Sequence, residues 1–505
     1  MGPESAQASP KQENNERFIN GNSIDEFFAD SVVMITGATG FVGKALVEKL
    51  LRACPRLAMI FILIRPKRDQ TIEQRFKNYL QEPVFDKIRP TNLLNKVRPI
   101  KGDVAQHDLG ISPEDRKLLI EKVNILFHSA ATVRFDEPLK VAVNLNTKGT
   151  DRIIQLCKSM KNLVSLIHVS TAYCNPDRKE IKEVIYPTRV KPWTMIDMCE
   201  SLDSSILDVL ENKILEHHPN TYTFTKGLGE QIILDNAKDL PMAIVRPSII
   251  GSADKEPTPG WVDGVFGITA MVLKVGTGNV TSLLCNPKLR VDLIPVDIVV
   301  DTLICAAWHS SMQQSNTTKV YNCTTGSNHL SWGTLNDGIV KYSIETPSNY
   351  IMWYPCSICR TNRFIHNVST ISLRVLPALV TDIFVRLTGG TPKLMKRMES
   401  VKRIARSTEF FRVNEWTFHN DNVIDMAKKL KSLKDGNNFT VTTEGLNWES
   451  YIRNYVLGVR KYVLKDTPDS LKEARSRLHI FHWLHRLTKV FSVLAVLMII
   501  MRISH

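Results

Sequence analysis

The hydrophobic pattern changes its period between residues 31 and 52, from that of a strand to that of a helix. Residues 32–35 are a short apolar run rich in β-branched side chains, which is typical of a buried strand. Apolar residues then recur three and four positions apart, as on one face of a helix: Val42, Leu46, Val47, Leu50 and Leu51. We therefore predict a strand, a tight turn and a helix in this order.

Three glycines lie in this turn, Gly37, Gly40 and Gly43, spaced G-x-x-G-x-x-G. Without a Cβ, glycine permits a tight bend, close approach of a pyrophosphate and close packing of helix on strand. The pyrophosphate would rest on the N-terminus of the helix. An ordinary strand-to-helix turn is the alternative, but the flanking strand and helix favour a dinucleotide-binding site.

The same alternation of strand and helix patterns continues along the chain. Residues 59–64 are a continuous apolar run, as expected of a parallel strand covered on both faces. Shorter runs follow at 97–100, 125–128, 163–169 and 242–245. Helical patterns lie between them, most clearly over residues 141–160. This alternation predicts βαβ crossovers and an α/β fold with a doubly wound parallel Rossmann sheet.

Two positions after predicted strands are candidates for cofactor recognition. Arg65, Lys67 and Arg68 follow the second strand, where an NAD-binding protein would place an acid. Cations at this point suit the 2′-phosphate of NADP, with Arg65 best placed, although a solvated basic loop has the same pattern. Asp103, after the third strand, either accepts a hydrogen bond from an adenine amino group or caps a turn.

A candidate catalytic pair, Tyr222 and Lys226, lies four residues apart on a predicted helix. The two side chains share one helix face, so the ammonium is expected to lower the pKa of the phenol and let Tyr222 deliver a proton. The strand over residues 163–169 ends in Ser170 and Thr171. A hydroxyl at this end of a parallel strand can hydrogen-bond a substrate oxygen as negative charge develops. The order of these motifs indicates hydride transfer.

Composition narrows the class of protein. The chain has 505 residues and a net charge of +14, which favours an anionic partner such as a phosphate-rich cofactor or a membrane surface. Nine scattered cysteines form no disulfide framework and favour a reducing compartment. The one close pair, Cys356 and Cys359, is weak support for a metal, and we predict no metal site. The polar residues 1–20 carry no signal peptide.

The end of the chain predicts attachment to a membrane. Residues 490–501 are uncharged and would span ~18 Å as a helix, less than the ~30 Å hydrocarbon core. Snorkelling of Lys489 and Arg502 would extend this reach. A buried core helix is the alternative, although little chain remains to cover it. The cations before the segment would keep the preceding chain on the cytosolic side.

Several motifs occur together in a familiar order. They are VMITGATGFVGKALVEKLL, LIRPK, KGDV, FHSAATVRFDEPL, NLNTKGT, HVSTAYCN, YTFTKGLGE, IVRPSII and PGWVDG. Later stretches WTFHNDNV and WESYIRNYVLGVRKYVLKD continue the match. The chain resembles the extended short-chain dehydrogenase/reductases, and more closely the animal, insect-like fatty acyl-CoA reductases, over nearly its whole length.

The resemblance implies roles for individual residues. The cofactor-binding set comprises the pyrophosphate loop (Gly37, Thr39, Gly40, Phe41, Val42 and Gly43), Arg65 at the 2′-phosphate, Asp103 and Val104 at the adenine, Ala130 and Ala131 in the cleft, and Pro247, Ser248 and Ile249 at the nicotinamide. Tyr222 and Lys226 are the catalytic pair and also contact the cofactor. Thr171 matches the catalytic hydroxyl because it directly precedes Ala172, and Ser170 is the alternative.

The resemblance also implies a domain plan. Residues 1–25 are a polar leader, 26–345 an NADP-binding and substrate-pocket domain, 355–465 a mainly helical C-terminal domain, and 478–505 a membrane-attaching tail. The region after Arg360 is more polar than is usual in the family, with Asn362, Asn367, Ser369, Thr370 and Ser372. That puts in doubt any membrane role for residues 364–388.

The implied activity is NADPH-dependent reduction of a long-chain fatty acyl-CoA to a primary alcohol, through an aldehyde and with release of CoA. The expected partners are acyl-CoA and a membrane, with no nucleic acid, and the expected place is the cytosolic face of the endoplasmic reticulum or peroxisome. A sterol- or sugar-type dehydrogenase of the same superfamily and a non-catalytic NADP-binding protein are the alternatives. The motifs specify neither acyl length nor oligomeric state.

Overall fold

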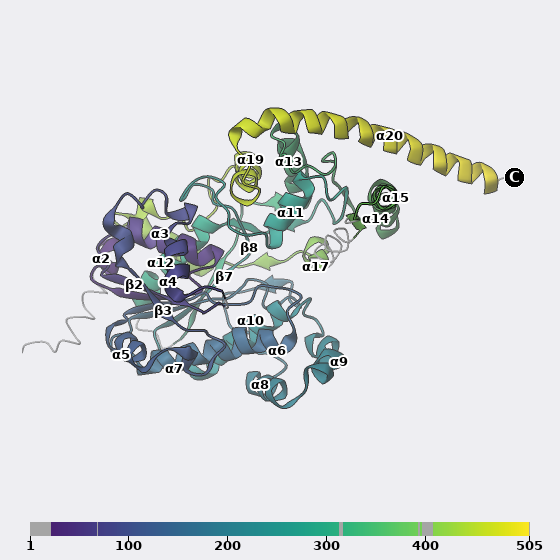
Figure 1. Cartoon of the computed structure of the whole chain (residues 1–505). Helices are drawn as coiled ribbons and strands as arrows, with labels where there is room; N and C mark the ends of the chain where they lie inside the picture. Colours follow the sequence, from purple (N-terminus) through teal and green to yellow (C-terminus); the bar gives the residue numbers. More distant parts are fainter. Residues whose placement is uncertain (1–21, 68, 313–316, 392–393, 396–407, 504–505) are drawn as a thin grey trace, which may run out of the picture. The chain divides into compact units, whose positions relative to one another are not determined.

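The computed structural model describes residues 22–67, 69–312, 317–391, 394–395 and 408–503 (Figure 1). Most of the predicted polar leader lies outside this part of the chain. The chain folds into two compact units that interleave along the sequence. The Rossmann unit comprises Met1–Ile250, Ile294–Ser327 and Trp416–Glu444, and the second unit comprises Gly251–Leu293, Asn328–Glu415 and Gly445–His505. The domain boundaries expected from the sequence stay a prediction.

A seven-stranded parallel sheet organises the Rossmann unit, as predicted. The strand order is β12-β7-β5-β4-β1-β2-β3. Its strands are β1 (Val32–Thr36), β2 (Met59–Ile64), β3 (Val97–Lys101), β4 (Ile125–His128), β5 (Ser165–Val169), β7 (Met242–Pro247) and β12 (Lys319–Cys323). The order reverses between β1 and β4, which is where open α/β sheets bind their ligands.

Helices connect these strands and cover the sheet (Figure 1). They are α2 (Ile24–Phe28), α3 (Phe41–Ala53), α4 (Ile72–Leu80), α5 (Pro113–Lys122), α6 (Leu139–Ala142), α7 (Gly149–Ser159), α8 (Pro192–Ser201), α9 (Ser204–Leu215), α10 (Thr221–Asn236), α12 (Val296–Ser311) and α18 (Asp421–Leu430). Apolar residues of α5, α7 and α10 form one core with the sheet, including Leu119, Ile153 and Leu228. The short strands β6 (Glu180–Ile181) and β15 (Thr417–Phe418) pair in parallel, which ties residues 416–444 to this unit.

One predicted helix is divided in the structure. The helical pattern over residues 141–160 becomes α6, a π turn η4 (Val143–Lys148) and α7. A π turn accommodates one extra residue and often marks a functional site. Asn146 lies in this turn and is buried. The sequence pattern did not reveal this turn, because one added residue leaves the segment helical and changes the apolar spacing at one place only.

The second unit is mainly helical. Its helices are α11 (Gly267–Gly276), α13 (Trp332–Glu345), α14 (Arg363–Thr370), α15 (Leu376–Leu387), α17 (Glu409–Val413), α19 (Trp448–Gly458) and α20 (Leu471–Ile503). Two small sheets pair β9 (Ser282–Leu284) with β14 (Ile358–Arg360) and β10 (Arg290–Val291) with β13 (Leu330–Ser331). β8 (Ile249–Gly251) and β11 (Leu293–Pro295) lie where the chain passes from one unit to the other.

Close backbone contacts and hydroxyl pairs hold the core of the second unit together. A Cβ on Gly458 would lie 1.7 Å from the carbonyl oxygen of Gly260, so glycine is required where α19 crosses this segment. The hydroxyls of Thr269 and Tyr455 are 2.7 Å apart, which links α11 to α19.

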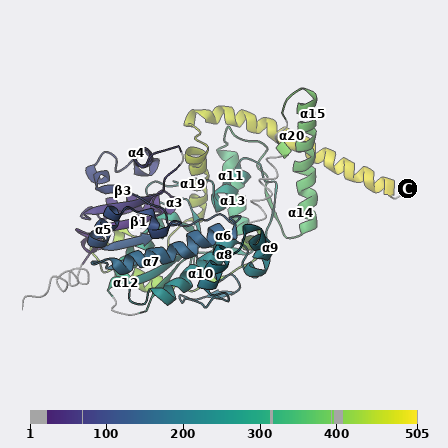
Figure 2. The same cartoon turned by 60° about the horizontal axis from the view of Figure 1, so that its bottom comes forward.

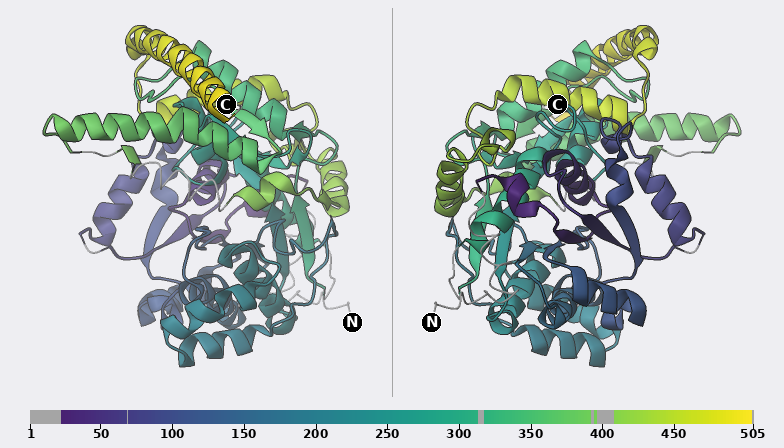
Figure 3. Two further views of the ribbon diagram at one scale, coloured as in Figure 1. Left: turned by 90° about the vertical axis from the view of Figure 1, so that its right-hand side faces the viewer. Right: turned by 90° about the vertical axis from the view of Figure 1, so that its left-hand side faces the viewer.

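Two features of the second unit bear on the membrane predictions. α20 is one continuous helix through the predicted tail (Figure 3). Within the described residues, however, the helix that is long and apolar enough to cross a membrane is Arg363–Leu387, which comprises α14, a π turn and α15. By length and composition this helix is therefore a candidate for contact with a membrane, against the doubt raised by its polar residues. The polar residues noted there lie between apolar ones and do not shorten the apolar helix.

Candidate active site

The predicted site residues of the Rossmann unit gather at the carboxyl edge of the sheet. Gly37 follows β1, Ala130 and Ala131 follow β4, and Thr171 follows β5. Pro247 is the last residue of β7. Because the carboxyl ends of parallel strands meet at one edge, these residues converge on the point where the strand order reverses.

The glycine loop has the geometry of a phosphate cradle. Gly37 has φ +73°, and a Cβ there would lie 2.7 Å from the backbone nitrogen of Ala130. A Cβ on Gly43 would lie 2.3 Å from the carbonyl oxygen of Gly37. Gly40 is the N-cap of α3, and no side chain caps that helix. The loop is thus compact, and the N-terminus of α3 is open to an anion.

Beside Arg65, which the sequence assigned to the 2′-phosphate, the structure adds a cation that sequence reasoning missed. Arg65 is exposed at the end of β2, and the Arg75 guanidinium on α4 donates to the carbonyl oxygen of Arg65. Burial and the nearby charge of Arg65 lower the pKa of Arg75. Lys67 is exposed, and Arg68 lies outside the described residues. Arg75 lacked a sequence signal because it lies ten residues beyond the strand end.

On the adenine side, Asp103 caps a turn. Its Oδ1 accepts a hydrogen bond from the Ala105 backbone N–H at 3.0 Å. The sequence left two roles open for Asp103, and the turn cap is the second of them. The cap uses one of the two carboxylate oxygens. Val104 is buried, and its carbonyl oxygen accepts a hydrogen bond from Arg152 at 2.7 Å.

The catalytic candidates lie side by side. The Lys226 ammonium is buried and donates to the carbonyl oxygen of Val169, the last residue of β5, at 2.7 Å. Tyr222 is half-buried, hydrogen-bonds the Thr171 side chain and stacks on Phe135 with ring centroids 6.0 Å apart. The helix α10 and the end of β5 thus bring together three of the predicted residues.

Burial sets the proton affinities of this pair. Burial raises the pKa of Tyr222 to about 12, against the opposing effect of the Thr171 hydrogen bond. Burial also lowers the pKa of Lys226 to about 8, while Glu230 opposes that shift. The prediction that Lys226 lowers the pKa of Tyr222 toward neutrality is therefore wrong for this structure. The ammonium is directed at a backbone carbonyl, and the loss of solvent around the phenol dominates.

Ser170 and Thr171 have different partners. Ser170 Oγ donates to Glu230 Oε1 at 2.5 Å, inside a buried network. Thr171 Oγ1 accepts from the Tyr173 backbone N–H at 3.3 Å and keeps its own proton for donation. Of the two candidates for the catalytic hydroxyl, Thr171 is the one directed at Tyr222.

A buried ion pair that sequence reasoning missed supports these residues. Arg246 on β7 contacts both carboxylate oxygens of Glu230 on α10, and their side chains are 0% and 2% exposed. Arg246 also donates to the carbonyl oxygens of Lys182 and Val184. The available signal was Arg246 in the otherwise uncharged motif IVRPSII and Glu230 in the motif TKGLGE.

The predicted nicotinamide loop contains an unpaired buried hydroxyl. The Ala172 backbone N–H donates to the Pro247 carbonyl oxygen at 2.9 Å, so the loop follows the end of β5. Ser248 is 6% exposed, and its Oγ has no hydrogen-bond partner among the described residues. Buried hydroxyls are normally satisfied, so this one is available to a ligand. Ile249 is half-buried beside it.

Asn146 in the π turn also belongs to the site's framework. Its Nδ2 donates to Thr225 Oγ1 at 3.0 Å and to the Thr132 carbonyl oxygen at 3.1 Å. Its Oδ1 accepts from the Thr132 backbone N–H at 2.9 Å. The side chain therefore connects the segment after β4 with α10. The motif NLNTKGT contains this residue, but its role depends on a turn that the sequence pattern does not reveal.

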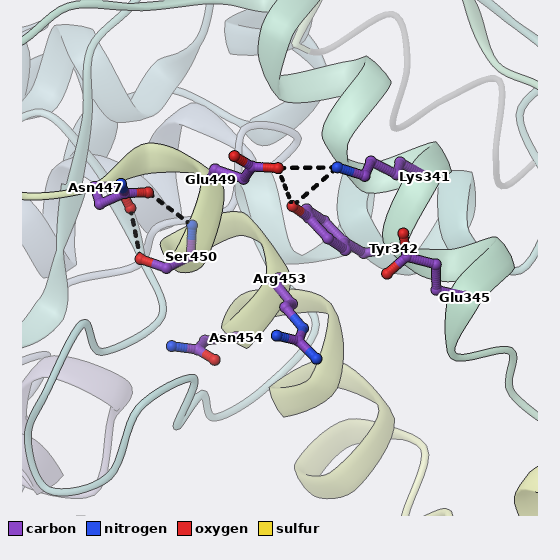
Figure 4. A pocket seen from close by; sticks show the side chains of 8 residues that line it. All are labelled: Lys341, Tyr342, Glu345, Asn447, Glu449, Ser450, Arg453 and Asn454. Carbon is purple, nitrogen blue, oxygen red and sulfur yellow. Dashed lines mark hydrogen bonds and ion pairs between the residues drawn. The ribbon is translucent and has the colours of Figure 1, made fainter.

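A separate pocket of about 540 Å³ lies in the second unit between α13 and α19 (Figure 4). Its lining residues are polar or charged: Lys341, Tyr342, Glu345, Asn447, Glu449, Ser450, Arg453 and Asn454. Lys341 Nζ and Tyr342 Oη both lie 2.9 Å from Glu449 Oε1. None of the predicted site residues lines this hollow, so the candidate active site is the edge of the Rossmann sheet.

The fold and the site together define a nicotinamide-dependent oxidoreductase of the short-chain dehydrogenase/reductase type. Comparison with known proteins identifies the branch. A family profile described as "Male sterility protein, NAD_binding_4" matches residues 35–303, and a second, "Male sterility protein, Sterile", matches residues 373–466. Fatty acyl-CoA reductase 1 of Mus musculus is 37% identical over 460 residues, covering 90% of this chain and 89% of the relative. Fatty acyl-CoA reductase 2 of Bos taurus is 38% identical over 468 residues, covering 91% and 90%. The chain belongs to the fatty acyl-CoA reductase family.

Solved structures agree on the fold. The terminal R domain from the myxalamid PKS-NRPS biosynthetic pathway has a TM-score of 0.58 at 16% identity, over 89% of this chain and 97% of that one. The reductase domain of a nonribosomal peptide synthetase from Mycobacterium tuberculosis has a TM-score of 0.56 at 17% identity, over 88% and 95%. At these identities the likeness concerns the fold alone.

Proposed function

We propose that this protein reduces long-chain fatty acyl-CoA to a primary fatty alcohol with NADPH, through an aldehyde and with release of CoA. The observation that carries the proposal is the arrangement of Thr171, Tyr222 and Lys226 at the sheet edge that also holds the glycine loop. The similarity to fatty acyl-CoA reductases over nine tenths of the chain supports the substrate class.

The residues present fit a nicotinamide dinucleotide phosphate. The uncapped N-terminus of α3 receives the pyrophosphate, and Arg65 with Arg75 receives the 2′-phosphate. The unpaired Ser248 hydroxyl lies in the loop assigned to the nicotinamide. Two NADPH molecules, bound one after the other, would supply the two hydrides that the conversion of a thioester to an alcohol requires.

The side chains of this site provide the proton and the oxyanion stabilisation. Thr171 and Tyr222 donate hydrogen bonds to the carbonyl oxygen of the thioester as it gains negative charge. A phenol whose pKa is about 12 stays protonated at neutral pH, so it remains a donor until the oxygen takes its proton. As the C–S bond breaks, the hemithioacetal O–H returns its proton to Tyr222 and the C=O bond forms again. The CoA thiolate takes a proton from water, and an aldehyde remains. The same two hydroxyls then donate hydrogen bonds to the aldehyde oxygen, which becomes the oxygen of the alcohol.

Lys226 is the second member of the candidate pair, and its side chain is buried beside the end of β5. Its ammonium is fixed to the end of β5 by the Val169 carbonyl oxygen, where it would hold the nicotinamide ribose. A sterol- or sugar-type dehydrogenase would share this chemistry. The match of residues 373–466 to the second family profile favours the acyl-CoA reductase instead.

Attachment to a membrane fits a substrate with a long acyl chain. The tail carries exposed apolar side chains on α20, among them Val490, Phe491 and Met498. The tail attaches the protein to a membrane, with the catalytic unit in the cytosol, on the endoplasmic reticulum or peroxisome. The cations that precede the apolar run favour this orientation.

The test is turnover by the purified full-length protein with acyl-CoAs of several chain lengths and NADPH. The expected products are the fatty alcohol and free CoA, with two NADPH consumed for each alcohol. An assay that yields no alcohol from any of these thioesters, but oxidises a sterol or a sugar nucleotide, would overturn the proposal.

A further inference from the structure

The helix Arg363–Leu387 presents an apolar stripe away from its own unit. α14, the π turn η5 (Ile371–Val375) and α15 form one continuous helix (Figures 2 and 3). The stripe comprises exposed residues on successive turns, among them Phe364 (75% exposed), Val368, Ile371, Leu376, Val380 and Phe384 (66% exposed). A surface helix of a water-soluble domain normally turns such a stripe inward.

The π turn keeps the two halves of the stripe on one face. Along the helix the exposed apolar residues recur every three or four positions, but Leu376 follows Ile371 by five. A π turn adds one residue to a helical turn, so a step of five returns to the same face there. The stripe is therefore continuous along the whole helix.

The opposite face of the helix is polar and is bound to the second unit. Arg363 forms an ion pair with Glu409 on α17. His366 Nδ1 lies 2.8 Å from Ser282 Oγ on β9. Together these contacts hold the first turn of the helix with its polar side inward.

A third contact holds the middle of the helix. The Arg374 guanidinium donates to the carbonyl oxygen of Gly278 and to Asn279 Oδ1, in the turn after α11. Polar contacts therefore occupy the inner face over at least three turns, and apolar residues occupy the outer face.

These contacts decide between two ways of meeting a membrane. A helix of 25 residues is ~37 Å long, enough to cross the ~30 Å hydrocarbon core. Crossing would, however, carry Gly278 and Asn279 into the hydrocarbon with Arg374, and exposed turns are not tolerated there. A helix lying flat in the interface keeps every polar contact and buries the stripe.

We propose that Arg363–Leu387 is an interfacial helix that docks the second unit flat on an anionic phospholipid bilayer. Its apolar stripe enters the acyl region, and the exposed cation Arg386 reaches lipid phosphates beside it. The net charge of +14 favours an anionic surface over a neutral one. This helix is a separate element from the predicted tail, which lies on α20.

The neighbouring helix α20 extends the same lipid-binding surface. It contacts the π turn η5 and is fixed by the Trp353 Nε1–H donating to His485 Nδ1 at 3.0 Å. α20 exposes apolar residues of its own, including Trp483, Phe491 and Leu494. Together, the two adjoining helices expose a larger apolar area than a single surface patch would. A large exposed apolar area of this kind marks a surface that binds a membrane.

Flotation with vesicles tests the docking. All variants are full chains carrying Phe491→Asp and Leu494→Asp, so that the tail does not mask the result. Adding Val380→Asp and Phe384→Asp should weaken binding to phosphatidylcholine–phosphatidylserine vesicles roughly 100-fold. The matched control adds Ile206→Asp and Val209→Asp on α9, where Val209 is 80% exposed, and should bind like the parent chain. Equal binding by both pairs, with unchanged thermal unfolding, would overturn the proposal.

Labelling tests whether the helix lies flat. Cysteines at Asn362→Cys and Thr388→Cys bracket the helix, and a membrane-impermeant maleimide is added outside sealed vesicles. We expect both sites to react, as read by mass spectrometry of the two peptides. Reaction at one end only would show a crossing helix.

A stripe variant that keeps lipid binding but loses self-association would show that a second copy covers the stripe. Neither readout depends on turnover, so either result is separate from the proposed function.

Discussion

Arg246 and Glu230 form a two-point contact, with Nε 2.8 Å from Oε1 and Nη2 2.5 Å from Oε2, inside the Rossmann unit. Glu230 lies on α10, eight residues after Tyr222, and Arg246 directly precedes Pro247 at the end of β7. Ser170 at the end of β5 donates to the same carboxylate. One ion pair therefore fixes three segments that carry the proposed site.

Glu230→Gln should reveal how much this pair contributes. The variant leaves the Arg246 guanidinium buried without a counter-charge, so we expect a loss of about 3 to 5 kcal/mol in the free energy of unfolding. Urea denaturation measures it. The control is Asp86→Asn, which breaks the exposed Arg89–Asp86 pair and should cost less than about 1 kcal/mol. Similar losses in the two variants would contradict a structural role for the buried pair.

Tyr222→Phe should abolish alcohol formation while leaving NADPH binding intact. The substitution removes the proton donor and keeps the ring that stacks on Phe135. Gas chromatography of the products and calorimetric titration with NADPH separate the two effects. Tyr350→Phe, at an exposed tyrosine of the second unit, should change neither quantity. Near-normal turnover in Tyr222→Phe would refute the proposed donor.

Thr171→Ala and Ser170→Ala should differ in what they lose. Removing the Thr171 hydroxyl takes away an oxyanion donor, which we expect to lower kcat by about 10²- to 10³-fold with little effect on stability. Ser170→Ala removes a hydrogen bond to a buried carboxylate, so its main effect should be on unfolding, by about 1.5 to 3 kcal/mol. Thr171→Ser should recover most of the rate. The reverse pattern would assign the catalytic hydroxyl to Ser170.

Arg65→Ala should raise the Michaelis constant for NADPH much more than that for NADH. A charge-assisted contact to phosphate contributes about 1.5 to 3 kcal/mol, which corresponds to roughly 10- to 150-fold. Steady-state kinetics with each cofactor gives the ratio. Arg98→Ala, at an exposed cation of β3, serves as the control. Equal effects on both cofactors would show that Arg65 does not bind the 2′-phosphate.

The pH profile of kcat/KM should carry an alkaline limb set by Lys226. Burial lowers the pKa of Lys226 to about 8, so its ammonium is present below that pH and is lost as the pH rises through it. Tyr222, with a pKa of about 12, does not titrate in this range. We therefore expect activity to fall above about pH 8. In Lys226→Arg, whose cation keeps its proton, any residual activity should stay flat to pH 10. A limb that remains in that variant would belong to another group.

Local sequence was sufficient to predict most strands of the sheet and to select the candidate site residues, whose roles stay a prediction. The strands β1, β2 and β4 coincide with predicted apolar runs, because strands buried on both faces are apolar throughout. The glycine turn and the pair Tyr222 and Lys226 were also predictable, since fixed spacings of three and four set their geometry within one turn of chain. The edge strand β12 (Lys319–Cys323) was missed because its pattern alternates with polar residues.

Only the tertiary structure decided the partners of these residues. The sequence did not decide which of Ser170 and Thr171 is the catalytic hydroxyl. Adjacent residues at a strand end face different partners, and the partner of Ser170 is Glu230, sixty residues away. The pKa of Tyr222 likewise depends on solvent exclusion by distant segments. The same limit applies to Arg363–Leu387. Its spacing of apolar residues defines an amphipathic helix, but which side meets the protein was set by Ser282, Gly278 and Glu409, and those contacts turn the apolar side outward.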